Sequence, residues 1–263
     1  MTISEQDIIR LKLDSGIAAI TLNRPESLNA LNPDLLGTLE RTLDELAKDA
    51  TLKAVTLTGA GSKAFVAGAD ISSMNAYGPR GISEYLELGQ RVMRKIETLP
   101  VPVIALVNGY ALGGGLELAL ACDIIIAADT AKLGQPEVNL GIIPGFGGTQ
   151  RLIARCGVGA SRRLCYTGDL VTAEEAKLLG LADKVVPQAS LQEEGLKMAK
   201  TIAEKAPLAI RGCKKVIRQS EEARLLSGLR LEVEEFQSLF ATVDRAEGMD
   251  AFLGKRPAKF VGK

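Results

Sequence analysis

The stretch 107–123 constrains the fold of this chain more than any other segment. The apolar run 103–107 predicts a buried strand, and it leads through a short turn to three consecutive glycines at 113–115. Good helix formers follow and include one acid, Glu117. Glycines at a strand-to-helix turn let a ligand approach the backbone and leave the first helical N–H groups unpaired. Those N–H groups favour a developing oxyanion, so this unit predicts chemistry on a carbonyl group.

The composition excludes several classes of function. Lys plus Arg and Asp plus Glu each number 32 in 263 residues, so no net field attracts nucleic acid or an anionic membrane. The absence of histidine removes His-dependent triads, histidine-ligated zinc and a His general base. The four cysteines lack C-x-x-C spacing, and the N-terminus resembles neither a signal nor a transit peptide. We therefore expect a cytoplasmic protein with one large domain, or one domain with a helical appendage.

Strand and helix signals alternate along most of the chain. Strands are predicted at 8–13, 17–22, 53–59, 103–107 and 122–127, the first two as a hairpin. Helices are predicted after the Asn32 cap, before residue 99, and from capping boxes at 172–175 and 190–193. Segments 61–70 and 74–82 are predicted as loops, the second of them mobile. The alternation indicates a wound α/β body with parallel strands, followed by helices from residue 190 onward.

Two patterns in the helical C-terminal region leave alternatives open. Leu229, Val233, Phe236 and Phe240 form an apolar stripe, which would pack either on the core of the same chain or on another subunit. A basic face contains Arg211, Lys214, Lys215 and Arg218. Such a face is more often a solvated helix surface than a patch for phosphate groups.

A second glycine-dense block, 133–149, surrounds another acid, Glu137. Both Glu117 and Glu137 have apolar neighbours, so each must be paired, hydrogen-bonded or raised in pKa. Either could be a structural ion pair, but two glutamates beside two glycine loops favour acid–base chemistry. The spacings of phosphate-binding and dinucleotide-binding glycine loops do not occur, which argues against nucleotide binding.

At these residues the chain resembles the crotonase superfamily, and within it the enoyl-CoA hydratases. The matching stretches are 23–31, 64–71, 107–123, 134–152 and 241–260. The resemblance implies an α/β fold: a spiral of ββα turns at 1–200 that carries the active site, and a helical oligomerisation region at 201–263. It also implies a homo-oligomer, either a trimer or a dimer of trimers.

The resemblance implies roles for particular residues. Ala69 and Gly114 would supply the oxyanion-hole amides, Glu117 and Glu137 the acid–base pair, and Gly145 an amide near the reacting water. The residues expected to contact coenzyme A are Arg24, Ser27, Leu28, Ala67, Asp70, Ile71, Lys259 and Phe260.

The expected reaction is reversible addition of water to a short-chain trans-2-enoyl-CoA, which gives a 3-hydroxyacyl-CoA. No metal or redox cofactor is expected. Coenzyme A enters the reaction as part of the substrate and does not count as a cofactor. Two alternatives remain open: another acyl-CoA enzyme of this fold, such as an isomerase or thioester hydrolase, and a non-catalytic protein that binds acyl-CoA or RNA.

Overall fold

Within the residues that the structure describes, the fold contains two β-sheets, and the larger one has six strands. A computed structural model describes residues 8–261, except for the side chains of 222–228 and 231. The strands of this sheet, in spatial order, are β1 (Ile9–Asp14), β2 (Ile17–Leu22), β3 (Ala54–Gly59), β5 (Val103–Val107), β7 (Ile124–Ala128) and β10 (Lys184–Val186). β1 and β2 form the predicted antiparallel hairpin, and every other neighbouring pair is parallel.

A smaller sheet carries the strands that lie between those of the larger one in sequence. Its order is β4 (Ala64–Val66), β6 (Tyr110–Leu112), β8 (Lys132–Gly134) and β9 (Leu170–Thr172). From β3 to β8 the chain alternates between the two sheets, and helices follow each pair of strands. This alternation is the predicted spiral of ββα turns, and the α/β fold class is confirmed.

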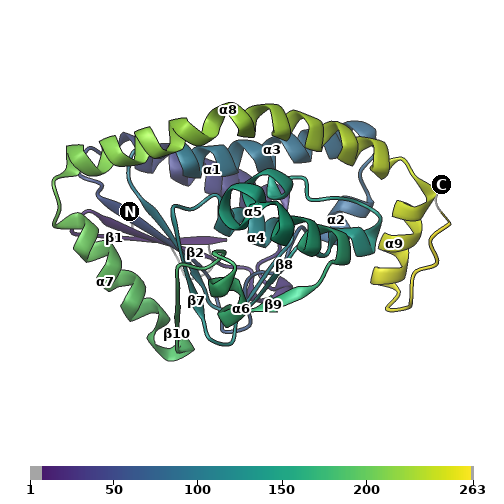
Figure 1. Cartoon of the computed structure of the whole chain (residues 1–263), viewed down its shortest axis with the longest axis horizontal. Helices are drawn as coiled ribbons and strands as arrows, with labels where there is room; N and C mark the ends of the chain where they lie inside the picture. The colour runs from purple at the N-terminus through teal and green to yellow at the C-terminus, as the bar shows by residue number, and fades with distance from the viewer. Residues whose placement is uncertain (1–7, 262–263) are drawn as a thin grey trace.

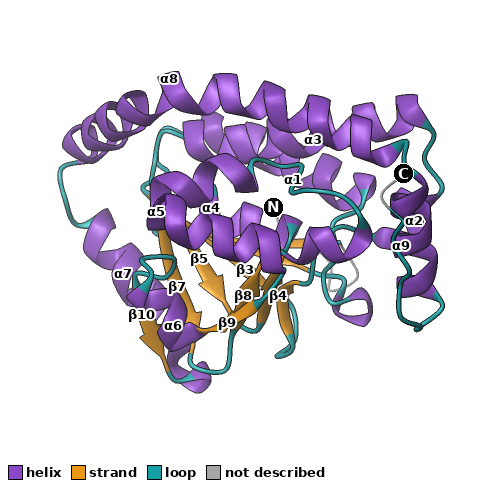
Figure 2. Ribbon diagram, turned by 45° about the vertical axis from the view of Figure 1, so that its right-hand side comes forward, coloured by secondary structure: helices purple, strands orange, loops and turns teal. Residues whose placement is uncertain are grey.

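Helices cover the sheets and form a layer above them (Figure 1; Figure 2). They are α1 (Pro33–Lys48), α2 (Ile71–Asn75), α3 (Pro79–Thr98), α4 (Gly114–Leu120), α5 (Gly148–Thr167), α6 (Ala173–Leu178), α7 (Leu191–Ala203), α8 (Pro207–Phe240) and α9 (Val243–Leu253). Short 3-10 turns lie at η1 (Pro25–Ser27), η2 (Pro136–Leu140) and η3 (Gln188–Ser190). α7 packs against the larger sheet, whereas α8 runs along the top of the molecule against α3 and α5. Within the described residues, no helix combines the length and apolar character needed to cross a membrane.

Helix α1 forms as its sequence predicts. The side chain of Asn32 accepts a hydrogen bond from the amide of Leu35 at 2.9 Å, and Pro33 occupies the first helical position. Its apolar stripe is buried, and the stripe consists of Leu35, Leu36, Leu39, Leu43 and Leu46. Each buried leucine contributes roughly 1.5–3 kcal/mol of transfer free energy, so packing against α3 holds this helix in place.

Three local predictions were wrong or incomplete. Segment 74–82 is partly helical, because α2 ends at Asn75 and α3 begins at Pro79. Segment 61–70 contains the short strand β4 as well as loop. Thr172 caps α6 as predicted, but Ser190 makes no side-chain cap for α7, because the preceding 3-10 turn gives it helical dihedrals.

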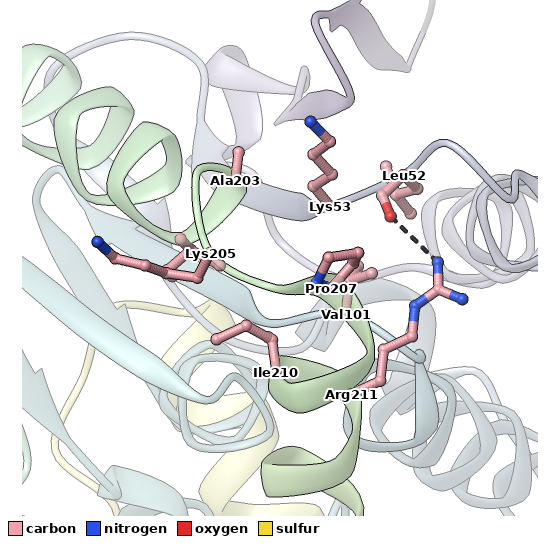
Figure 3. A pocket seen from close by; sticks show the side chains of 9 residues that line it. Leu52, Lys53, Val101, Ala203, Lys205, Pro207, Ile210 and Arg211 are labelled. Carbon is pink, nitrogen blue, oxygen red and sulfur yellow. Dashed lines mark hydrogen bonds between the residues drawn. The ribbon is translucent and has the colours of Figure 1, made fainter.

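The basic face of α8 is neither fully solvated nor free for phosphate groups. Lys214 is 9% exposed, and its ammonium donates to Asp123 at 2.7 Å and to the carbonyls of Ile96 and Val101. Arg211 donates to the Leu52 carbonyl, as Figure 3 shows. The hollow beside Arg211 encloses about 10 Å³, the space of a single water. These two cations fasten α8 to the body of the protein.

Replacing Lys214 by Met should lower the unfolding free energy by about 1–3 kcal/mol, because two buried carbonyls and the Asp123 carboxylate each lose one hydrogen-bond donor. Chemical denaturation followed by circular dichroism measures this change. Lys215→Met is the matched control, since Lys215 is exposed on the next position of the same helix. Equal stability of the two variants would contradict the structural role of Lys214.

Candidate active site

The candidate site lies where three parallel strands of the smaller sheet end. β4, β6 and β8 run parallel, so the segments that follow them emerge at one edge. These segments border a mostly apolar cavity of about 500 Å³. Of the residues predicted for the site, the following line this cavity: Leu28, Ala67, Ala69, Ile71, Gly114, Glu117, Glu137 and Gly145.

Glu117 lies in the first turn of α4 and is only 1% exposed. Its Oε1 accepts hydrogen bonds from the amides of Phe146 at 2.8 Å and Gly148 at 2.6 Å. Burial is the main cause that raises its pKa well above the usual range, and the neighbouring carboxylates of Glu232 and Glu137 add to it. The two amides oppose this shift, because hydrogen bonds to a carboxylate favour its charged form.

Glu137 reaches the cavity from the 3-10 turn η2 and is 8% exposed. Burial, with a smaller effect from Glu232, raises its pKa to about 8. When its amide is oriented to satisfy both groups, buried Gln135 donates to the two carboxylate oxygens at 2.8 and 3.0 Å. Burial therefore favours the protonated form of Glu137, and the Gln135 amide opposes this by favouring the carboxylate.

The backbone amides of two cavity-lining residues, Ala69 and Gly114, have definable orientations. Leu31 accepts from the amide of Asp70 and donates to the carbonyl of Gly68. Because peptide groups alternate in extended chain, the amide of Ala69 points to the opposite side. Gly114 is the first residue of α4, where N–H groups have no partner within the helix.

The glycine turn is needed for close packing around this site. Gly113 has φ +51°, a region that favours glycine, and Glu137 packs against it. A Cβ on residue 115 would lie 2.0 Å from the carbonyl oxygen of Val66, which is far inside van der Waals contact. Larger residues at these positions would displace the strand or the carboxylate.

A third buried glutamate was missed in the sequence. Glu232 of α8 is 3% exposed, and burial raises its pKa to about 7. Its signal was present, because it lies three residues after Leu229 and four before Phe236 on the apolar stripe. Leu229, Phe236 and Phe240 are buried within the same chain, so most of that stripe packs on the core of its own chain rather than on another subunit.

The other predicted ligand-binding residues lie outside the cavity lining. Arg24 forms an ion pair with Asp70 at 3.1 Å, so its charge is already partnered, and Ser27 ends the 3-10 turn η1. Lys259 and Phe260 lie on the C-terminal tail, where the Lys259 amide donates to Glu247 and Phe260 is 48% exposed.

Comparison with known proteins assigns the family. The sequence profile of the enoyl-CoA hydratase/isomerase family matches residues 12–263. The chain belongs to this family. Membership confirms the resemblance to the crotonase superfamily, and it places the protein among enzymes rather than binding modules.

Several named relatives are similar to this chain over nearly their whole length. Crotonyl-CoA hydratase of Syntrophomonas wolfei is 44% identical, covering 97% of this chain and 98% of its own. Short-chain-enoyl-CoA hydratase of Clostridium acetobutylicum is 43% identical, covering 96% and 97%. The crystal structure of enoyl-CoA hydratase from Bacillus anthracis superposes with a TM-score of 0.81 at 40% identity, over 98% of this chain and 100% of that one.

Proposed function

We propose that this protein is an enoyl-CoA hydratase that adds water to a short-chain trans-2-enoyl-CoA. The observation that carries the proposal is the pair of buried carboxylates, Glu117 and Glu137, on one cavity beside the amides of Ala69 and Gly114. The names of the relatives from S. wolfei and C. acetobutylicum support hydration and a short acyl chain.

In the proposed mechanism the two amides bind the thioester carbonyl oxygen. This draws electron density from C3, and the enolate-like charge that develops on the oxygen is stabilised by roughly 3–4 kcal/mol per donor. Glu117 takes a proton from the water that attacks C3, with the amide of Gly145 near that water. Glu137 delivers a proton to C2, which requires that it enter the step protonated.

The aromatic end of the cavity supports a preference for short acyl chains. The rings of Tyr85 and Phe146 meet edge to face with centroids 5.2 Å apart, and Phe236 lines the same cavity. A Cβ on Gly89 would lie 2.2 Å from the Phe146 ring, so this ring is wedged between α3 and the glycine turn. We propose that these rings limit the length of the acyl tail.

Recognition of coenzyme A and self-association are further parts of the proposal. Leu28, Ala67 and Ile71 at the cavity, together with Arg24, Ser27, Asp70, Lys259 and Phe260, are proposed to contact the CoA portion of the substrate. Residues 201–263 are proposed to mediate association into a trimer or a dimer of trimers. Exposed apolar side chains on α8, such as Val216 and Ile217, support this, and analytical ultracentrifugation tests it.

The direct test of function is the loss of ultraviolet absorbance of the enoyl thioester when the protein is added to crotonyl-CoA. Rapid loss with formation of 3-hydroxybutyryl-CoA is the expected result. A folded protein that binds CoA but leaves enoyl-CoA chains of every length unhydrated would overturn the proposal. Conversion of 3-enoyl to 2-enoyl-CoA without hydration would point instead to an isomerase.

The rate of hydration should fall above about pH 8. Glu137 must be protonated to act as the acid, and its pKa is raised to about 8, so the active form disappears as pH rises through that value. Glu117 must be ionised, so its raised pKa should place the acid limb above the usual range for glutamate. Initial rates of crotonyl-CoA hydration at saturating substrate between pH 5 and 10 measure both limbs.

The control for the basic limb is Glu137→Gln. The residual activity of this variant should no longer fall as pH rises through about 8. A basic limb that persists unchanged in this variant would assign the titration to another group.

A further inference from the structure

The catalytic carboxylate is held by the beginning of helix α5. Two of the first amides there, those of Phe146 and Gly148, donate to one oxygen of Glu117. Both donors are backbone amides at the start of α5 and none comes from α4, so the position of the Glu117 carboxylate depends on where this turn lies. Any group that fixes the turn therefore acts on Glu117.

The next amides of the same turn, those of Gly147 and Thr149, donate to a different carboxylate. Gly147 donates to Oε1 of Glu232 at 2.5 Å, and Thr149 donates to Oε2 at 3.0 Å through its amide and again through its hydroxyl. Glu232 arrives from α8, 85 residues along the chain from Gly147. It is 3% exposed, so water does not compete for these bonds.

Four consecutive amides at 146–149 thus alternate between Glu117 and Glu232. On its other side the turn is held by Arg151, which donates to the Phe146 carbonyl at 2.6 Å and to Glu97 at 2.7 Å. Gly147 has φ +103°, a conformation that few residues adopt and that the surrounding contacts must maintain.

We propose that Glu232 is a positioning residue for Glu117: by holding the amides of Gly147 and Thr149, it keeps those of Phe146 and Gly148 on the catalytic carboxylate. The inference rests on the proposed function, because it assumes that Glu117 acts in hydration. Without Glu232, one buried and one partly buried N–H group at the positive end of α5 would lose their acceptor, and the turn would rotate to find others.

Charge and geometry at Glu232 have opposite consequences for Glu117. The titratable and polar side chains that interact with Glu232 are Thr149, Arg151 and Cys165 of α5, Glu117 of α4 and Glu137 of η2. As a nearby negative charge, Glu232 raises the pKa of Glu117. As the anchor of the turn, it supplies Glu117 with amides that lower that pKa. A variant that keeps the charge but loses the geometry separates the two effects.

Glu232→Asp is that variant, since its carboxylate is set back by about 1.5 Å and cannot reach both amides. We expect kcat for crotonyl-CoA hydration to fall about 10- to 100-fold, as a small misplacement of a catalytic group does, with KM nearly unchanged. The acid limb of the kcat profile should move to higher pH, because Glu117 keeps its charged neighbour but loses amide donors. Glu232→Gln should also lower kcat, since its NH₂ group cannot accept from an amide. Glu235→Asp, at an exposed position of α8, is the control.

Two results would overturn the inference. Glu232→Asp with wild-type kcat, alongside a Glu232→Gln acid limb displaced to lower pH, would mean that Glu232 acts only through its charge. If the Glu232 variants had a lower melting temperature but an unchanged kcat per folded molecule, Glu232 would stabilise the fold without positioning Glu117. A wild-type protein that hydrates no enoyl-CoA would instead overturn the proposed function, and the positioning role with it.

Discussion

Replacing Glu117 by Gln should lower kcat for hydration of crotonyl-CoA by roughly 10²- to 10⁴-fold, the range for loss of a general acid or base. The amide side chain has nearly the same shape, and its oxygen can still accept from Phe146 and Gly148, so the fold should persist. KM should change little, because in the proposed mechanism backbone amides and the cavity wall, rather than this carboxylate, hold the thioester. The loss of enoyl absorbance measures both constants.

Glu137→Gln should show a loss of the same size, because the proposed reaction needs both proton transfers. The matched control is Glu235→Gln, which alters an exposed glutamate and should leave the rate unchanged. If either active-site variant hydrated crotonyl-CoA at the wild-type rate, the two-carboxylate mechanism would be wrong. The surviving activity would then identify the remaining glutamate as sufficient.

Gly114→Pro should lower kcat by roughly 10²- to 10³-fold, because proline removes one of the two N–H groups proposed to stabilise the developing oxyanion. Proline is tolerated at the first position of a helix, so α4 should still form. A thermal melt followed by circular dichroism, run beside the rate measurement, verifies that the variant is folded.

The paired variant Gly114→Ala separates the lost amide from simple crowding. It keeps the N–H but adds a Cβ that would lie 3.2 Å from the Phe146 ring and 3.3 Å from Leu31, a tight contact that small shifts relieve. We expect a clearly smaller loss of kcat in the alanine variant. Equal losses in the two variants would mean that space at residue 114 matters and that its amide does not act on the carbonyl.

Much of the fold could be predicted because the signals are local. The Asn32 cap, the leucine stripe of α1, the hairpin around the 14–16 turn and the Thr172 cap each depend on residues within a few positions of one another. Ser190 shows the limit of such rules, because a preceding 3-10 turn changed its backbone conformation and removed the cap. Lys214 shows another limit. The sequence correctly predicted that it lies on a helix, but it could not indicate the ion pair with Asp123, which lies 91 positions away.

The candidate site divides in the same way. The sequence by itself determined the strand–glycine–helix unit with Glu117, the second acid Glu137, and the family, because each motif is a short contiguous pattern. Only the tertiary structure decided that the ends of β4, β6 and β8 meet at one cavity, and that α8 inserts Glu232 against the start of α5. The physical reason is that caps, turns and apolar stripes are fixed by nearby residues. By contrast, the buried carboxylates of Glu117 and Glu232 receive their hydrogen bonds from a segment far away in the sequence, and no local pattern encodes those partners.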